Sequence, residues 1–204
     1  MRKNEILQTK IITEECYTTI MQVYFEELLN KYDNIVKMIN NTKKDVILES
    51  SFLQILLAKA YYKNGKISNS IELCLKILKK YNKIYECWMI LSLCYIRQNK
   101  LNDALIAINN SLVIRPLNSI SLAIKANIFY KKNELQEALN YYIYASVVRP
   151  QNNSYKEKII IIKHKNNNLI NFLEKYEKSE IVDMLLKNVS NIQIELTHLN
   201  NIKL

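Results

Sequence analysis

The sequence contains very little glycine and proline. Its 204 residues include one glycine and two prolines. Tight hairpins and the ends of sheet strands depend on these residue types, so their scarcity favours helices throughout. One glycine could hardly build the glycine-rich loop that cradles phosphate groups. The composition therefore predicts an all-α chain that has no phosphate-binding loop.

Histidine is also scarce, and it occurs only as His164 and His198. Neither histidine has a partner at the spacing of metal ligands, and no Ser/His/Asp or Cys/His set can be proposed from spacing alone. The sequence thus offers no catalytic residue and no metal ligand. We expect a protein that is not an enzyme, needs no cofactor and has no small-molecule substrate.

Long apolar runs and paired cysteines are absent. The longest purely aliphatic run is Ile159–Ile162, whereas a membrane-spanning helix needs about 20 apolar residues. The first residues are basic but lack the apolar stretch and cleavage site of a secretory signal. No Cys-x-x-Cys pair occurs, and the cysteines lie among apolar neighbours, which predicts free thiols in a reducing, intracellular setting. We expect a cytoplasmic protein, with the nucleus left open. The cysteines are Cys16, Cys74, Cys87 and Cys94.

What the sequence does contain is a fixed period. The segment Tyr85–Asn118 holds two helical patterns separated by a polar break at Gln98–Lys100, and it spans one period. A shift by this length brings the same kinds of residue back, which is the signature of a repeat built from two helices. The matching pairs are Trp88 and Leu122, Tyr95 and Phe129, Leu101 and Leu135, Ala104 and Ala138, Ser111 and Ala145, and Pro116 and Pro150.

The recurring residues have physical roles in such a unit. Two antiparallel helices pack closely only where side chains are small, as at Ala104 and Ala138, while large apolar residues fill the space between neighbouring pairs. Pro116 and Pro150 end the second helix of each pair, because proline lacks the amide donor and clashes with the preceding turn. One pair cannot bury its apolar face alone, so the pairs must stack.

These residues resemble the tetratricopeptide repeat. The resemblance implies an all-α, right-handed α-solenoid of helix-turn-helix repeats with capping helices at both ends. It covers residues 50–152, with repeats at 51–84, 85–118 and 119–152. The chain departs from the family pattern at Gln54, which replaces a bulky aromatic residue, at Asn82, which replaces the proline, and at Lys125, which replaces a leucine. The alternative is a helical bundle with a chance similarity.

The flanking segments keep the repeat pattern poorly. Residues 1–49 are expected to form a degenerate helix pair that caps the first repeat, with one apolar stripe at Ile20, Val23, Tyr24, Leu28 and Leu29. Residues 153–178 are expected to form a degenerate fourth repeat, whose second helix would carry an apolar set at Leu169, Phe172, Leu173 and Tyr176.

Residues 179–204 are expected to form a C-terminal capping helix. Its apolar stripe is Ile181, Leu185, Val189, Ile192, Leu196 and Leu199, which recur at intervals of three and four residues. A minority interpretation is a partner-binding or coiled-coil helix.

In the family that the chain resembles, the first helix of each pair lines a concave groove that binds a peptide or a helix of another protein. The resemblance carries this role onto a mixed set of apolar and basic residues. From the first repeat these are Phe52, Ile55, Lys59, Tyr62 and Lys63; from the second, Met89, Leu93, Ile96 and Arg97; from the third, Asn127, Tyr130 and Lys131. Some members clamp the carboxylate of a chaperone tail with a lysine and an asparagine, but Ile55 and Lys59 stand in those places here, which disfavours that ligand.

A cation recurs once in every repeat of this groove, at Lys63, Arg97, Lys131 and Lys165. One interpretation is a basic ladder for an acidic peptide. The other is that a cation near the C-terminus of a helix is favoured by the helix dipole by about 0.3–1 kcal/mol.

The charge of the repeats leaves two functions open. The chain carries a net charge of +10, and residues 50–151 account for +9 of it, with 14 basic and 5 acidic side chains. The leading prediction is a scaffold or adaptor that binds a protein partner; an acidic partner and membership of a larger complex are both compatible with it. The alternative is an RNA-binding helical-repeat protein, because phosphate binding is largely electrostatic. Against it, Ile55, Met89 and Ala123 occupy groove places where readers of single bases present polar groups.

Overall fold

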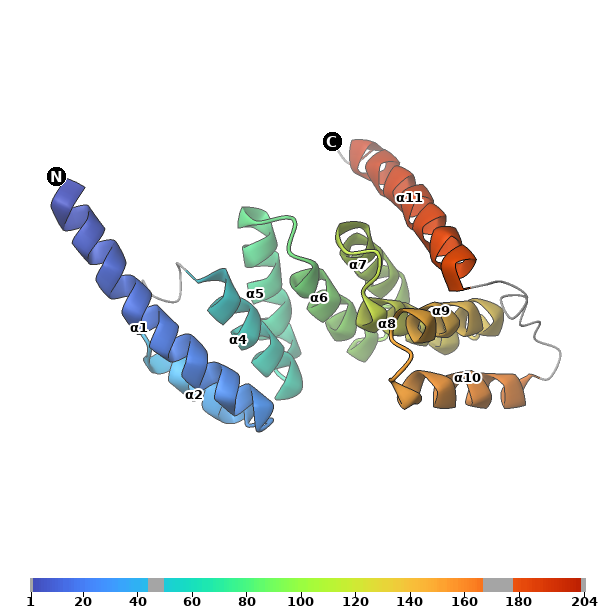
Figure 1. Ribbon diagram of the computed structural model, residues 1–204, viewed down its shortest axis with the longest axis horizontal. Helices are drawn as coiled ribbons and strands as arrows, with labels where there is room; N and C mark the ends of the chain where they lie inside the picture. Colours follow the sequence, from blue (N-terminus) through green and yellow to red (C-terminus); the bar gives the residue numbers. More distant parts are fainter. Residues whose placement is uncertain (1, 44–49, 167–177, 203–204) are drawn as a thin grey trace. The chain divides into compact units, whose positions relative to one another are not determined.

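The computed structural model describes residues 2–43, 50–166 and 178–202, and within them every regular element is an α-helix (Figure 1). The chain divides into two compact units, Met1–Asn82 and Lys83–Leu204. The first contains α1 (Arg2–Leu28), α2 (Tyr32–Asn41), α4 (Ser51–Lys63) and α5 (Ile67–Lys80). The second contains α6 (Tyr85–Arg97), α7 (Leu101–Ile114), α8 (Ser119–Lys131), α9 (Leu135–Val148), α10 (Asn153–Lys165) and α11 (Lys178–Ile202). The predicted all-α fold is confirmed.

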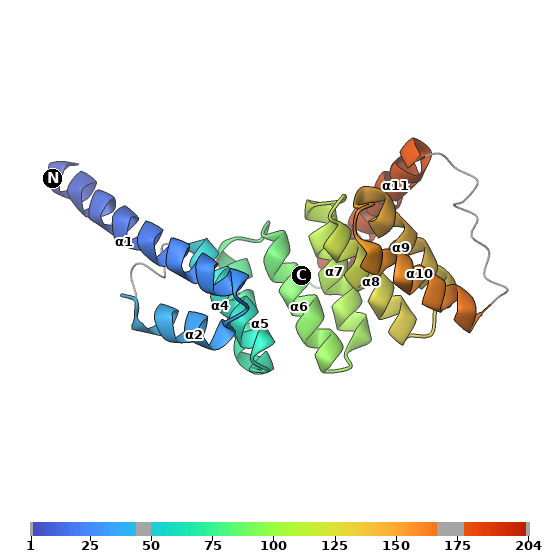
Figure 2. The same ribbon diagram turned by 60° about the horizontal axis from the view of Figure 1, so that its bottom comes forward.

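The helices follow the repeat period of the sequence. First helices begin at Ser51, Tyr85, Ser119 and Asn153, and second helices begin at Ile67, Leu101 and Leu135. Helices α4 and α5, α6 and α7, and α8 and α9 pack as hairpins, as Figures 1 and 2 show. The second helices α7 and α9 end two residues before Pro116 and Pro150, as the two prolines predict.

Each hairpin turns through one residue with a positive φ angle. That residue is Gly65 (φ +76°) after α4, Asn99 (φ 57°) after α6 and Asn133 (φ 63°) after α8. In all three turns the amide of this residue donates to the carbonyl three residues earlier, and the next amide donates five residues back. Asparagine tolerates the left-handed region better than most residues, so the chain makes these turns with one glycine.

Small side chains allow the paired helices to approach closely. The facing pairs are Ala58 and Ser70, Ser92 and Ala104, and Ala126 and Ala138, and all six residues are buried. The Ser70 hydroxyl donates to the Ala58 carbonyl and the Ser92 hydroxyl to the Ala104 carbonyl, each at 2.8 Å. These hydroxyls are therefore satisfied inside the hairpins, which removes the cost of burying them.

In the first unit, α2 and α4 both pack on α1. Val23 of α1, Ile35 and Ile39 of α2, and Leu53 of α4 are buried in one cluster. The single stripe predicted for α1 is only partly correct. Val23 is buried and Ile20 half-buried, but Tyr24, Leu28 and Leu29 are exposed. The physical reason is that α1 carries apolar residues around more than one face, and only one of those faces meets α2 and α4.

In the second unit, α11 lies along α7 and α9 (Figures 1 and 2). Ile181, Leu185, Val189 and Ile192 are buried, and the first three join the cluster formed by α7, α8, α9 and α10. The helix therefore packs by its predicted stripe, but it does so across two second helices of the stack. The predicted second helix of the fourth repeat, with Leu169, Phe172, Leu173 and Tyr176, lies outside the described residues, as does the side chain of Leu199.

None of the helices in the described part of the chain is both long enough and apolar enough to cross a membrane.

Candidate functional site

The first helices of the second unit each end on a basic residue, and α10 also carries Lys163 and His164 in its last turn. Arg97, Lys131 and Lys165 are the last residues of α6, α8 and α10, and all three are exposed. The Lys165 ammonium lies 4.8 Å from the centre of the Tyr130 ring, so α8 and α10 meet at this face. A cation over an aromatic ring at this distance is attracted by the electron density of the ring face.

A small pocket opens beside these residues, with a volume of about 70 Å³. Two of the predicted groove residues, Asn127 and Tyr130 of α8, line it, and so do residues that the sequence analysis did not single out. The additional residues are Tyr142 of α9 and Lys158, Ile161 and Ile162 of α10. The pocket therefore combines an amide, two phenol groups and an ammonium with aliphatic walls.

Burial raises the pKa of one of these phenols. Loss of solvent raises the pKa of Tyr142 from 10.0 to about 12, and the neighbouring Tyr130 and Tyr155 add to the rise. At physiological pH Tyr142, like an ordinary tyrosine, is neutral and can both donate and accept a hydrogen bond. With Asn127 and Lys158, the pocket offers donors to a partner's carbonyl or carboxylate oxygen.

The remaining groove residues of the second unit are only partly exposed to solvent. Met89, Leu93 and Ile96 of α6 are half-buried, and they pack against the cluster that contains Ile124 and Ile128 of α8. They lie on the expected helix, but part of each side chain stabilises the stack. Their exposed edges are what a partner could contact.

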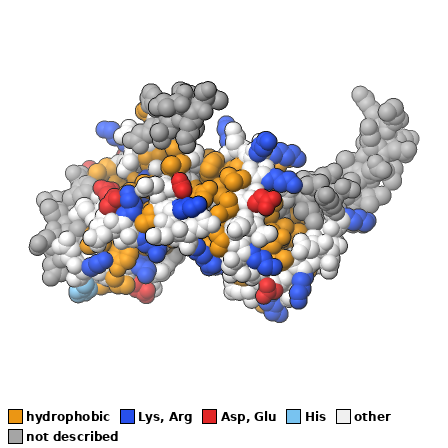
Figure 3. Space-filling model, turned by 180° about the vertical axis from the view of Figure 1, so that it is seen from behind, with side chains coloured by type: hydrophobic (Ala, Val, Ile, Leu, Met, Phe, Trp, Pro, Cys, Tyr) orange, Lys and Arg blue, Asp and Glu red, His pale blue; other side chains and the backbone are white. Residues whose placement is uncertain are grey.

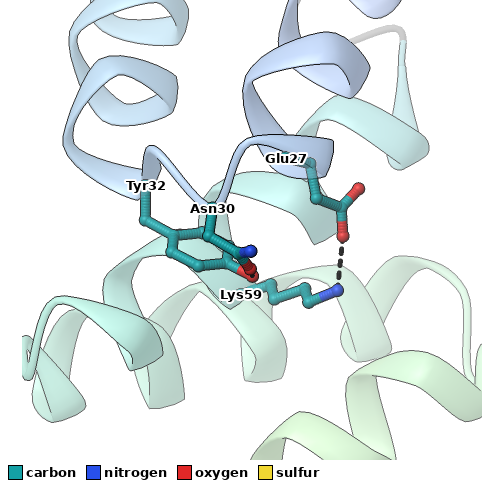
Figure 4. Close-up of polar contacts among 4 residues, drawn as sticks. All are labelled: Glu27, Asn30, Tyr32 and Lys59. Atoms are coloured by element: carbon teal, nitrogen blue, oxygen red, sulfur yellow. Dashed lines mark hydrogen bonds and ion pairs between the residues drawn. The ribbon is translucent and has the colours of Figure 1, made fainter.

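In the first unit, the predicted residues lie on α4 in a different setting. Phe52 is exposed, and Ile55 and Tyr62 are half-buried. The Lys59 ammonium forms an ion pair with the Glu27 carboxylate of α1 (Figure 4). Lys59 is thus held by an acid of this chain.

Lys63, the first cation of the predicted ladder, is exposed on the same helix. Its ammonium lies 5.6 Å from the centre of the Tyr32 ring of α2. The Tyr32 hydroxyl in turn lies 3.2 Å from the Asn30 side-chain oxygen, and both residues are drawn in Figure 4. The first unit therefore holds its groove cations close to an acid and a ring of its own N-terminal helix pair.

The period itself could have found one of the missed residues. Ile161 lies one repeat period after Asn127, so extending the groove register into the fourth repeat places it on the groove face. Lys158 lies one repeat period after Ile124, which is buried and is not a groove residue, so the groove register does not indicate Lys158. Glu27 carried no such signal, because its pairing with Lys59 depends on how α1 packs on α4.

Basic side chains outnumber acidic ones on the molecular face drawn in Figure 3, where they are interleaved with apolar groups. This agrees with the excess of basic residues in the repeats. In the described ranges, no cluster of three or more His, Cys, Asp or Glu side chains could hold a metal ion.

Known proteins share this arrangement of helices. The family described as anaphase-promoting complex, cyclosome, subunit 3 matches residues 21–111, a little under half of the chain. The crystal structure of MamA superposes with a TM-score of 0.59 at 13% identity, over 91% of this chain and 96% of that one. The first tetratricopeptide-repeat domain of Spaghetti (RPAP3), bound to an HSP90 peptide, superposes with a TM-score of 0.55 at 15% identity, over 59% of this chain and 95% of that one.

The chain has the tetratricopeptide-repeat fold. The resemblance seen in the sequence is therefore confirmed. A third structure with this fold is the Yersinia enterocolitica type III secretion translocator chaperone SycD, which superposes with a TM-score of 0.50 at 16% identity, over 66% of this chain and 90% of that one. None of the curated proteins compared with the chain matches it. The similar tetratricopeptide-repeat structures give no support to the RNA-binding alternative.

Proposed function

We propose that the chain is a non-enzymatic scaffold that binds an acidic peptide or helix of a partner protein along the first-helix face of its second unit. The pocket between α8 and α10 carries this proposal. There Asn127 and Lys158 offer hydrogen-bond donors beside the aliphatic Ile161, while Lys131 and Lys165 end the same two helices. Apolar walls with a few convergent polar groups are the usual composition of a recognition pocket.

The charge of this face favours an acidic partner. Arg97, Lys131, Lys158 and Lys165 are exposed cations, whereas Glu157 is the exposed acid on the α10 part of the face. Complementary charge speeds encounter and fixes register, and apolar anchors supply most of the affinity. A segment that alternates acidic with aliphatic residues suits both requirements.

The comparisons agree with a binding role of this kind. The RPAP3 domain is described with a bound peptide, SRMEEVD, that is itself acidic, and SycD is described as a chaperone. In this chain Ile55 and Lys59 replace the residues of the carboxylate clamp, and Lys59 pairs with Glu27. We therefore place the partner on the second unit and do not propose a chaperone tail.

The test uses a panel of fluorescein-labelled peptides in which acidic and aliphatic residues alternate, each matched by a copy with lysine in place of every acid. Fluorescence anisotropy should show saturable binding of acidic peptides to the full chain. Lys158→Glu should weaken it by about tenfold or more, because a like charge then faces the ligand.

Lys187→Glu is the matched control, because it makes the same change of charge at an exposed place on α11. This variant should bind like the unaltered chain. Equal binding of acidic and basic peptides, or equal losses in the two variants, would contradict the proposal.

A further inference from the structure

Helix α1 carries a second apolar face that its own unit does not cover. Met21, Phe25 and Leu28 are 52%, 59% and 62% exposed, and Tyr17 and Tyr24 lie on the same side of the helix. The intervals of three and four residues place all five on one stripe. Val23, which faces the core, is fully buried. An exposed stripe of large apolar residues is costly in water and marks a contact surface.

The turns show what Met21 and Phe25, the middle of this stripe, correspond to in the other repeats. After α1, the amides of Asn30 and Lys31 donate to the carbonyls of Glu27 and Glu26. After α4, the amides of Gly65 and Lys66 donate in the same way to Tyr62 and Tyr61. Aligning the two turns places Met21 on Leu56 and Phe25 on Ala60. Two repeat periods after Leu56 and Ala60, the equivalent residues are Ile124 and Ile128 of α8.

In those helices, these two places form the contact with the preceding helix pair. Leu56 and Ala60 of α4 belong to the cluster with α1 and α2, and Ile124 and Ile128 of α8 belong to the cluster with α6 and α7. All four are at most 8% exposed. Met21 and Phe25 thus form a stacking face of the same kind, and on α1 that face is open to solvent.

We propose that this open face is covered by the same face of a second copy of the chain, giving a two-fold dimer through α1. In a two-fold interface each patch meets itself, so the patch must be self-complementary. The residues named above are all apolar or aromatic and carry no formal charge. Residues 1–49 have 7 basic and 8 acidic side chains, a net charge of −1, so two copies of this segment do not repel each other as two copies of the basic repeats would.

The exposed area is sufficient for such a contact. The exposed parts of Tyr17, Tyr24 and Phe25 amount to roughly 300–350 Å² if each aromatic side chain is taken as about 200 Å². With Met21 and Leu28 the face reaches roughly 500–550 Å² per copy. Two copies would bury about 1,000–1,100 Å², which is the lower limit of specific interfaces and predicts a reversible dimer.

The near-neutral charge of the segment also disfavours other occupants. An anionic membrane surface attracts apolar helices that carry basic side chains beside the apolar face, and a net charge of −1 supplies no such attraction. A strongly acidic or strongly basic partner protein would likewise gain no electrostatic attraction from this segment. Apolar contact with a like surface is the remaining source of affinity.

Sedimentation equilibrium of the full chain over a range of micromolar concentrations tests the proposal. We expect a reversible shift from the chain mass of 24.1 kDa toward twice that mass. Phe25→Glu and Met21→Glu should each weaken the dimer by more than about tenfold, because each buries an unpaired carboxylate. Both residues are exposed in the isolated chain, so circular dichroism and melting should be unchanged at concentrations too low for the dimer to form. Ile160→Glu is the control, since Ile160 is an equally exposed apolar residue on α10.

Three results would overturn the proposal. The chain could remain monomeric over the whole concentration range. It could form a dimer that Phe25→Glu and Met21→Glu leave intact, or that Ile160→Glu disrupts equally. Monomeric chain that floats with phosphatidylcholine or phosphatidylserine vesicles, and loses this binding in Phe25→Glu, would show that a lipid surface is the occupant instead.

Discussion

The ammonium group of Lys125 lies 4.4 Å from the centre of the Tyr141 ring, although only 3% of this lysine is exposed. The Phe129 ring is 5.9 Å away. Lysine replaces the usual leucine of the repeat at this place, and the aromatic residues of α8 and α9 accommodate the change. The aliphatic stem fills the space of the leucine, and the charge rests on ring faces.

We expect Lys125→Met and Lys125→Ala to differ in stability. Methionine keeps the stem volume and removes a buried charge, so the free energy of unfolding should stay the same or rise. Alanine leaves a cavity between α8 and α9 and should cost about 2–4 kcal/mol. Urea unfolding of the two variants measures the difference. A methionine variant as unstable as the alanine variant would show that the charge itself holds the helices together.

Overpacking tests the close approach of the hairpin helices. Ala104 and Ala138 are fully buried, so Ala104→Leu or Ala138→Leu should lower the free energy of unfolding by about 1–3 kcal/mol. Asn102→Leu, at an exposed place on the same helix as Ala104, is the control and should change little. Thermal melts that do not distinguish Ala104→Leu from Asn102→Leu would mean that the helices do not meet at Ala104.

Adjacent leucines on α11 give a matched pair. Leu185 is 1% exposed and Leu186 is 38% exposed. Leu185→Ala should cost about 2–4 kcal/mol, because it removes a packed side chain, whereas Leu186→Ala should stay within about 0.5 kcal/mol of the unaltered chain.

A chain ending at Lys178 should be less stable and should aggregate, while circular dichroism still shows helix. Full solubility and an unchanged melting temperature in that chain would mean that α11 acts as a free arm.

Alkaline pH should destabilise the second unit through Tyr142. Its pKa is raised to about 12 in the folded chain and lies near 10.0 in the unfolded chain. The contribution of protonated Tyr142 to the free energy of unfolding is fully present below pH 10. It is lost as the pH rises toward 12, because the unfolded state releases the proton first. The loss should not exceed about 2 kcal/mol. Urea unfolding at pH 9 and pH 11.5 measures it, and Tyr142→Phe should reduce the difference more than Tyr81→Phe, which alters an exposed phenol.

The basic ladder of the second unit can be separated from general charge effects. The double variant Arg97→Glu and Lys131→Glu should weaken capture of an acidic peptide and make it less sensitive to salt. The double variant Arg149→Glu and Lys187→Glu changes the same charge at other exposed places and should bind normally. Unaltered affinity in the first variant would favour the helix-dipole explanation of these cations.

The sequence predicted what depends on contacts within a repeat. The period, the small residues at Ala104 and Ala138, and the prolines after α7 and α9 all act over short distances, so they determine helices and hairpins directly. Ile161 also follows from the period, once the groove register is extended to α10. Contacts between α1 and α4, such as Glu27 with Lys59, could not be predicted, because the degenerate pair has lost the register that aligns the other helices.

The packing partners of α11 likewise could not be predicted from the sequence. An apolar stripe says that a helix is buried, but it does not say which neighbour buries it. Ile181 and Leu185 would satisfy the same stripe on any apolar surface of sufficient length. Their place along α7 and α9 depends on which faces the stack leaves open.

Because α11 contacts α7 and α9, the apolar core of the second unit can be completed only after α11 has been synthesised. Neighbouring repeats join residues that are close in sequence, which permits rapid folding, whereas α11 joins the last part of the chain to α7, which ends at Ile114. At a synthesis rate of about 5–20 residues per second, roughly 3–11 seconds pass between the synthesis of Val148 and that of Ile202. During this time α11 is not yet complete and cannot cover α9. During that interval the apolar side chains on the surface of α9 that α11 covers are open to water and to other nascent chains. The synthesis of α11 thus determines when this surface of α9 is covered.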